Sequence, residues 1–238
     1  MLLAVLWGGL AAASLLLGYL LARRNLSNRS IGIVMGFGAG ALLSAIAYEL
    51  VPESVLGGIS MGVAFAIGAL TFFGADWWID HRGGADRKDI TGEKTGSGSA
   101  IFIGTLLDNI PESIILGMGL ALGGAINVAF LVAVFISNLP EGVAGTLNLE
   151  ASGRSRQRIF WMWAGLVAIS AVCAGLGYLL INWLPQADGR IAQAFAAGAM
   201  LTMLADAMMP EAFEHGGKLV GIMTVMGFLT AGALVVIQ

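Results

Sequence analysis

Two short motifs set acidic and amide side chains within long apolar stretches of the chain. They are Asp108–Glu112 (DNIPE) and Ser137–Glu141 (SNLPE), and both contain the pattern Asn-x-Pro-Glu. A carboxylate that faces lipid costs at least about 2.5 kcal/mol of membrane insertion. These side chains must therefore face a cavity, a protein partner or a cation, and their oxygens suit a divalent cation.

The spacing of the motifs brings their polar groups to one depth. A turn near Ala125 makes the two stretches an antiparallel helix hairpin, with Glu112 13 residues before it and Asn138 13 residues after it. At ~1.5 Å per residue both side chains lie about 20 Å from the turn, inside the membrane. Asn109 and Glu141 come level in the same way.

Three further features indicate an ion site. Asp108 and Glu112 are four residues apart and share one helical face. Pro111 and Pro140 each remove a helix hydrogen bond, and freed carbonyls can coordinate an ion where they line a cavity. Neither stretch contains Lys or Arg to neutralise its carboxylates. The alternative is that these groups only hydrogen-bond between packed helices, and protonation of one or two carboxylates would couple cation movement to protons.

The composition is typical of a membrane protein. Hydrophobic residues make up 58% of the chain and charged residues 11%, whereas soluble domains carry about 25% charged residues. A basic surface is absent, so no nucleic-acid partner is expected. The lipid bilayer is the expected surrounding, and the frequent Gly and Ala permit the close helix packing of a compact bundle or a homodimer.

Apolar stretches long enough to cross the bilayer recur eight times, and they are continuous rather than alternating. This predicts a single all-α membrane domain over residues 1–238, with a flexible cytoplasmic loop at 80–99. The expected spans are Leu3–Ala22, Ile31–Val51, Gly57–Ile79, Ala100–Leu122, Ala125–Leu147, Ile159–Leu184, Ile191–Met209 and Leu219–Ile237.

The basic residues predict the orientation of these spans. Only Arg190 among the 12 Lys and Arg residues lies outside the loops that follow spans one, three, five and seven. Cytoplasmic loops carry an excess of Lys and Arg, so those four loops face the cytoplasm. The sequence thus predicts a multi-pass protein of the inner (cytoplasmic) membrane with both termini extracytoplasmic.

An internal repeat relates spans two and seven. Phe37–Ser44 (FGAGALLS) aligns with Phe195–Thr202 (FAAGAMLT), at an offset of 158 residues, and the same offset places Pro52 on Pro210. The two spans run in opposite directions, as inverted repeats do in secondary transporters. We therefore expect spans 1–3 and 6–8 to be related halves around the central pair, spans 4–5. Chance similarity between two Gly/Ala-rich helices is the alternative.

The twin motifs on adjacent spans, the eight spans, the outward termini and the polar loop after span three resemble the ZIP family of divalent metal transporters. The resemblance covers essentially the whole chain. It implies a binuclear metal centre midway through the membrane that moves zinc, iron or manganese towards the cytoplasm, with the two glutamates as the ligands that bridge the pair of metals. Cadmium is expected to act as a surrogate for these ions. The implied metal ligands are Asp108, Asn109, Glu112, Ser137, Asn138 and Glu141.

The chain departs from the family pattern at two of these positions. Members commonly have His before each Asn, where this chain has Asp108 and Ser137. Nitrogen ligands favoured by zinc are therefore missing, and the harder oxygen set favours manganese, ferrous iron or magnesium relative to zinc.

Acidic residues at the ends of spans two and seven are candidates for the cation pathway. Glu49 and Glu53 lie at the outer end of span two, and Asp206 and Glu211 at the inner end of span seven. His215 shares a helical face with Glu211, so an exit site could form there with Glu214. Ordinary solvation at the membrane interface is the alternative for these residues.

The sequence therefore predicts a metal transporter, not an enzyme, whose path runs between spans two, four, five and seven. A transport-inactive metal sensor or scaffold is the main alternative, because the two histidines are replaced. An intramembrane metal enzyme is a weaker one, since it needs a general base, usually His, and the spans contain none.

Overall fold

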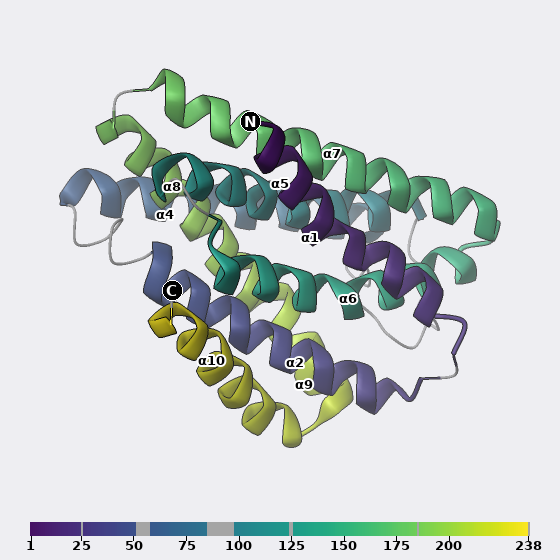
Figure 1. Ribbon diagram of the computed structural model, residues 1–238. Coiled ribbons are helices and arrows are strands. Elements are labelled where there is room, and N and C mark those ends of the chain that lie inside the picture. Colours follow the sequence, from purple (N-terminus) through teal and green to yellow (C-terminus); the bar gives the residue numbers. More distant parts are fainter. Residues whose placement is uncertain (25, 51–57, 85–97, 124–125, 185, 238) are drawn as a thin grey trace.

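The computed structural model describes residues 1–24, 26–50, 58–84, 98–123, 126–184 and 186–237 (Figure 1). These residues form helices and contain no strand. Eight of the helical segments are long and apolar enough to cross a membrane, which confirms the predicted all-α architecture and the number of spans.

Six of the eight spans start and end within a few residues of the predicted limits. The helices are α1 (Leu2–Leu21), α2 (Asn28–Ala45) with the π-helix η1 (Ile46–Leu50), α4 (Ile59–Ile79) with the π-helix η2 (Asp80–Gly84), α5 (Gly98–Gly123), α6 (Val128–Ala151), α7 (Arg156–Trp183), α8 (Gln186–Met203) with the π-helix η3 (Leu204–Met208) and α9 (Met209–Gly216), and α10 (Leu219–Ile237). Span five ends later than expected, and span seven continues beyond Met209 through α9.

The predicted loop at 80–99 is helical at both described ends. Residues 80–84 continue α4 as η2, and residues 98–99 already belong to α5. Residues 85–97 lie outside the described part of the chain, so the flexibility of that loop stays a prediction.

Side-chain caps explain where two of the spans begin. The hydroxyl of Ser27 accepts a hydrogen bond from the backbone N–H of Ser30 (3.1 Å), and the side-chain oxygen of Asn127 accepts one from Phe130 (2.8 Å). Such caps satisfy backbone donors that have no partner within the helix. Polar residues between the apolar stretches thus mark where these spans start.

α6 and α2 are the most enclosed spans, with 72% and 67% of their apolar windows buried, against 22% for α10. Figure 1 shows α6 between α1 and α2, with α7 and α10 at opposite edges. The central place of α6 matters because it carries one of the two motifs.

Glycines allow α1 and α7 to pack closely against the central helices α5 and α6. A Cβ added at Gly142 of α6 would lie 2.6 Å from the carbonyl oxygen of Leu15 in α1. Likewise, a Cβ at Gly177 of α7 would overlap the carbonyl oxygen of Ile114 in α5. Spans one and six therefore pack closely against the motif helices, a grouping that the repeat of spans 1–3 and 6–8 did not suggest.

The two stretches aligned by the internal repeat make equivalent glycine contacts with different neighbours. In each case a Cβ at one glycine would overlap a backbone carbonyl across the interface, and these pairs are Gly40 with Thr224, Gly227 with Phe37, Gly198 with Phe65, and Gly68 with Phe195. The π-helices η1 and η3 also lie 158 residues apart. These matches agree with the inverted repeat, which stays a prediction.

Candidate metal centre

All six implied metal ligands are buried side chains of α5 and α6. Their exposed fractions are between 1% and 4%, although each is polar or acidic. α5 contributes Asp108, Asn109 and Glu112, and α6 contributes Ser137, Asn138 and Glu141. Both helices continue through their internal prolines, so each motif stays on a helical face.

A direct hydrogen bond joins the two motifs. The side-chain amide of Asn138 donates to Oδ1 of Asn109 (3.1 Å), and the amide of Asn109 donates to the carbonyl of Thr105 (3.0 Å). This fixes both asparagines at one depth in the bundle. Oδ1 of Asn138 accepts no hydrogen bond from the described residues. A buried carbonyl oxygen of this kind costs about 1–3 kcal/mol unless a donor or a cation satisfies it.

Ser137 uses its hydroxyl proton within its own helix. Its Oγ donates to the carbonyl of Val134 (2.9 Å). The oxygen keeps lone pairs that can accept or coordinate, so the hydroxyl is compatible with a role as a metal ligand but is not oriented by the other motif.

The three carboxylates share the two facing helices without forming one tight cluster. Asp108, Glu112 and Glu141 are 1%, 2% and 4% exposed. Among the described His, Cys, Asp and Glu residues, however, the one group of three with ligand atoms within 4.8 Å of one another lies elsewhere. Repulsion between like charges is strong in a low dielectric. A cation bound between these helices would therefore take amide oxygens as well as carboxylates.

A buried hydrogen-bond chain fixes α6 beside the second motif. Nε1 of Trp163 in α7 donates to Oγ1 of Thr146 (2.9 Å), which donates to the carbonyl of Gly142 (2.7 Å). Trp163 is fully buried. Gly142 directly follows Glu141, so this chain sets the position of the backbone that carries the glutamate.

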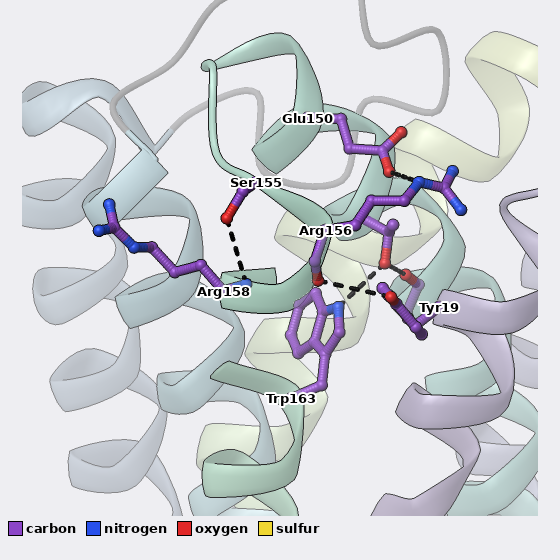
Figure 2. A network of polar contacts seen from close by, with 8 residues as sticks. Tyr19, Glu150, Ser155, Arg156, Arg158 and Trp163 are labelled. Atoms are coloured by element: carbon purple, nitrogen blue, oxygen red, sulfur yellow. Dashed lines mark hydrogen bonds and ion pairs between the residues drawn. The ribbon is translucent and has the colours of Figure 1, made fainter. Parts of the chain in front are cut away.

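The turn between α6 and α7 is held by a second set of polar contacts, which Figure 2 shows from close by. Arg156 forms an ion pair with Glu150 (2.6 Å), and the Tyr19 hydroxyl donates to the carbonyl of Arg156 (3.4 Å). These partly buried contacts lie at the predicted cytoplasmic end of the bundle.

A cavity of about 290 Å³ lies at the predicted extracytoplasmic end of the motif helices. Its walls come from η1 at the outer end of span two, from α5, from the start of α6 with the residues just before it, and from α8, so all four spans of the predicted path contribute. Glu49 lines it and is half-buried. Glu53, which was grouped with Glu49, lies outside the described residues.

The predicted exit residues come together at the end of α9. Nε2 of His215 lies 2.7 Å from Oε1 of Glu211. With Glu214 they form the group whose ligand atoms lie within 4.8 Å of one another. Asp206 belongs to η3 and is exposed. It therefore lies on the same span as the exit residues but is not a member of that group.

Reasoning from sequence missed two polar residues of the cavity, Gln193 and Asn127. Gln193 interrupts an Ala-rich stretch of α8 with a polar side chain, about two helical turns after the start of that helix. That interruption, taken together with Glu49 at the outer end of span two, was the signal available for finding it.

Comparisons with known proteins agree with this architecture. No protein-family model matches the chain. Zinc transporter ZupT of Escherichia fergusonii is 32% identical, and the match covers 96% of this chain and 95% of that protein. The chain belongs to the ZIP family. Zinc transporter ZupT of Salmonella arizonae is 29% identical over 79% of this chain and 77% of its own length.

Membership of the ZIP family and the eight apolar helices make the chain a multi-pass membrane protein. The family relatives are named as transporters. This agrees with the expectation of a transporter rather than an enzyme.

Proposed function

We propose that this protein transports divalent metal cations across the cytoplasmic membrane, through a site formed by α5 and α6. The observation that carries the proposal is the buried set of three carboxylates and two amides on these facing helices. No Lys or Arg in either helix neutralises that charge. A divalent cation supplies the missing positive charge. A role in passing the cation explains why these charged residues are kept inside the membrane despite the free-energy cost of inserting them.

Zinc is the proposed cation on the strength of the relatives' names, and manganese and ferrous iron are proposed beside it. The ligand set consists of oxygen atoms, with Asp108 and Ser137 at the two positions before the asparagines. Oxygen ligands suit manganese and iron, whereas zinc favours nitrogen and sulfur. Cadmium serves as a surrogate for binding measurements.

The proposed path connects the outer cavity, the metal centre and the group at the end of α9. Glu49 lines the cavity, and Asp206 and Glu211 follow along span seven towards the predicted cytoplasmic side. We propose movement towards the cytoplasm, with both termini extracytoplasmic. A homodimer is compatible with the exposed apolar faces of α4, α7 and α10, which are the least enclosed spans.

The test of transport uses purified protein in liposomes with a metal-sensitive dye inside. Wild-type protein should accumulate zinc, manganese or ferrous iron well above empty vesicles when a metal or proton gradient is applied. Uptake no greater than that of empty vesicles for all three cations, with correctly inserted protein, would rule out the transport proposal.

The same preparation separates a transporter from a transport-inactive scaffold, whereas a metal sensor would bind metal without moving it into the vesicles. In the scaffold alternative the ligands have drifted, so metal binding should not depend on the two motif glutamates. Binding should therefore be compared between wild type and the double variant Glu112→Ala with Glu141→Ala. A transporter loses its high-affinity binding in the double variant, whereas a scaffold shows no difference.

A further inference from the structure

The outer cavity contains a polar side chain to which neither motif assigns a role. Gln193 lines the cavity from α8 and is only 6% exposed. Its Oε1 accepts no hydrogen bond from any described residue. An amide oxygen buried in this way needs a donor or a cation, and leaving it unsatisfied costs about 1–3 kcal/mol.

Glu49 supplies a negative charge to the same cavity. It lies in η1, which packs against α8, the helix that carries Gln193. A carboxylate and an amide carbonyl in one cavity offer two hard oxygen ligands of different kinds. A volume of about 290 Å³ leaves room for several water molecules, which complete the coordination shell of a hard cation.

The cavity is aligned with the metal centre along α5. Leu116 and Gly119 line it, and they continue the helical face of Asp108 and Glu112 at steps of three and four residues. Leu116 lies four residues from Glu112, or about 6 Å along the helix. The cavity is therefore adjacent to the centre in the direction of transport.

On both motif helices the cavity is lined by apolar residues on the side towards the centre. Leu116 of α5 and Phe130 of α6 both line the cavity, and they are 3% and 2% exposed. The nearest motif residues on the two helices are Glu112 and Ser137, and neither of them lines the cavity. A cation held in the cavity thus occupies a place of its own and does not share ligands with the centre.

We propose that Gln193 and Glu49 form an outer binding site for a partly hydrated divalent cation before it reaches the metal centre. This inference rests on the proposed transport function and deepens it. Glu49 provides the charge that attracts the cation, and the Gln193 carbonyl replaces one water molecule of its shell. This site should have a low affinity for the cation, because most of the ligands are water molecules.

Binding measured without the metal centre tests the proposal. The double variant Glu112→Ala with Glu141→Ala, in which His215→Ala and Glu211→Ala also disable the group at the end of α9, should retain one weak site for manganese or zinc by titration calorimetry. Adding Gln193→Leu should weaken that residual site at least tenfold, a loss of about 1.4 kcal/mol. Adding Asn182→Leu should leave it unchanged, because Asn182 is an exposed amide on α7 that bonds only within its own helix.

A second substitution separates ligation from packing. Gln193→Glu keeps an oxygen ligand and adds charge, so it should tighten the residual site several-fold. A purely structural glutamine would give weaker binding for both substitutions. The Glu variant also decides the matter if Gln193→Leu fails to fold.

Transport kinetics provide the complementary readout. With the centre intact, Gln193→Leu should raise the KM for metal uptake several-fold and leave kcat within about twofold, because the change lowers outer binding alone. The proposal is overturned if the centre-disabled protein binds no metal, or if Gln193→Leu changes neither its binding nor the KM. Failure of transport by wild type would instead refute the proposed function, independently of the residual site.

Discussion

At the scale of single residues, Glu112 and Glu141 carry the charge on which the proposed metal centre depends. Glutamine has nearly the same size and shape as glutamate and still forms hydrogen bonds, but it carries no charge. Glu112→Gln or Glu141→Gln should therefore lower metal uptake in liposomes at least tenfold, a loss of about 1.4 kcal/mol of transition-state stabilisation.

The matched control for these changes is Glu150→Gln. Glu150 is on the same helix as Glu141 but forms an ion pair with Arg156, in which both side chains are partly exposed. Exposed ion pairs contribute about 0–1 kcal/mol to stability, so this variant should fold and transport like wild type. Equal uptake by all three variants and wild type would contradict the assignment of the glutamates.

Asp108 should set the choice between metals. It occupies the position at which ZIP proteins commonly have His, and it is 1% exposed beside Asn109. Asp108→His introduces a nitrogen ligand that zinc prefers over manganese. The ratio of zinc to manganese uptake should rise several-fold, as measured with both metals competing in one vesicle preparation. A ratio that stays constant, or falls, would show that Asp108 does not contact the transported ion.

The burial of the motif residues, predicted from the sequence, is confirmed, whereas their role as metal ligands stays a prediction and the way they meet was not predicted. Three carboxylates in apolar segments had to be enclosed, because their cost in lipid is independent of packing detail. The bond between Asn138 and Asn109 depends on the helix crossing, which hydropathy does not specify. Gln193 was missed for a related reason, because a single amide in an apolar span indicates a binding site only when the cavity around it is known.

At the scale of helices, close glycine contacts position the motif helices. In α7, a Cβ at Gly177 would overlap the carbonyl oxygen of Ile114, whereas one at Gly165 would meet no atom within 4 Å. Gly177→Ala must push α7 away from α5 and should destabilise the protein by about 1–3 kcal/mol. It should lower the Tm in detergent by several degrees.

Gly165→Ala is the control on the same helix. Alanine is favoured over glycine within a helix by roughly 0.5–1 kcal/mol, so the Tm of this variant should stay the same or rise. Equal Tm values for the two variants would show that the contact between α5 and α7 adapts without cost.

The helices themselves were the most predictable part of the fold. Their lengths follow from the thickness of the bilayer, and short caps such as Asn127 mark where they begin. The π-helical turns and the grouping of α1 and α7 with the central pair were not predicted. Both depend on packing between spans that are distant in sequence.

At the scale of the whole molecule, the distribution of basic residues predicts the topology. Arg190 lies at the predicted outer side and Lys218 at the inner side, and both are exposed. In a background with Cys173→Ala, Arg190→Cys should react in whole cells with a membrane-impermeant thiol reagent. Lys218→Cys should react only after the membrane is permeabilised. The reverse pattern would overturn the orientation and, with it, the assignment of outer and inner ends to the pathway.

The π-helix η3 also bears on how sequences of this family can change in length. Deleting one residue from an α-helix turns everything beyond it by about 100°. A π-helical turn contains one residue more than the α-helical turn it replaces. If one residue within Leu204–Met208 is deleted, the π-helical turn can become an α-helical turn. Glu211 and His215 then point in the same direction as before the deletion. Single-residue gaps should be tolerated there in natural relatives, while the same gap in α5 or α6 would turn half of a motif helix away from its partner.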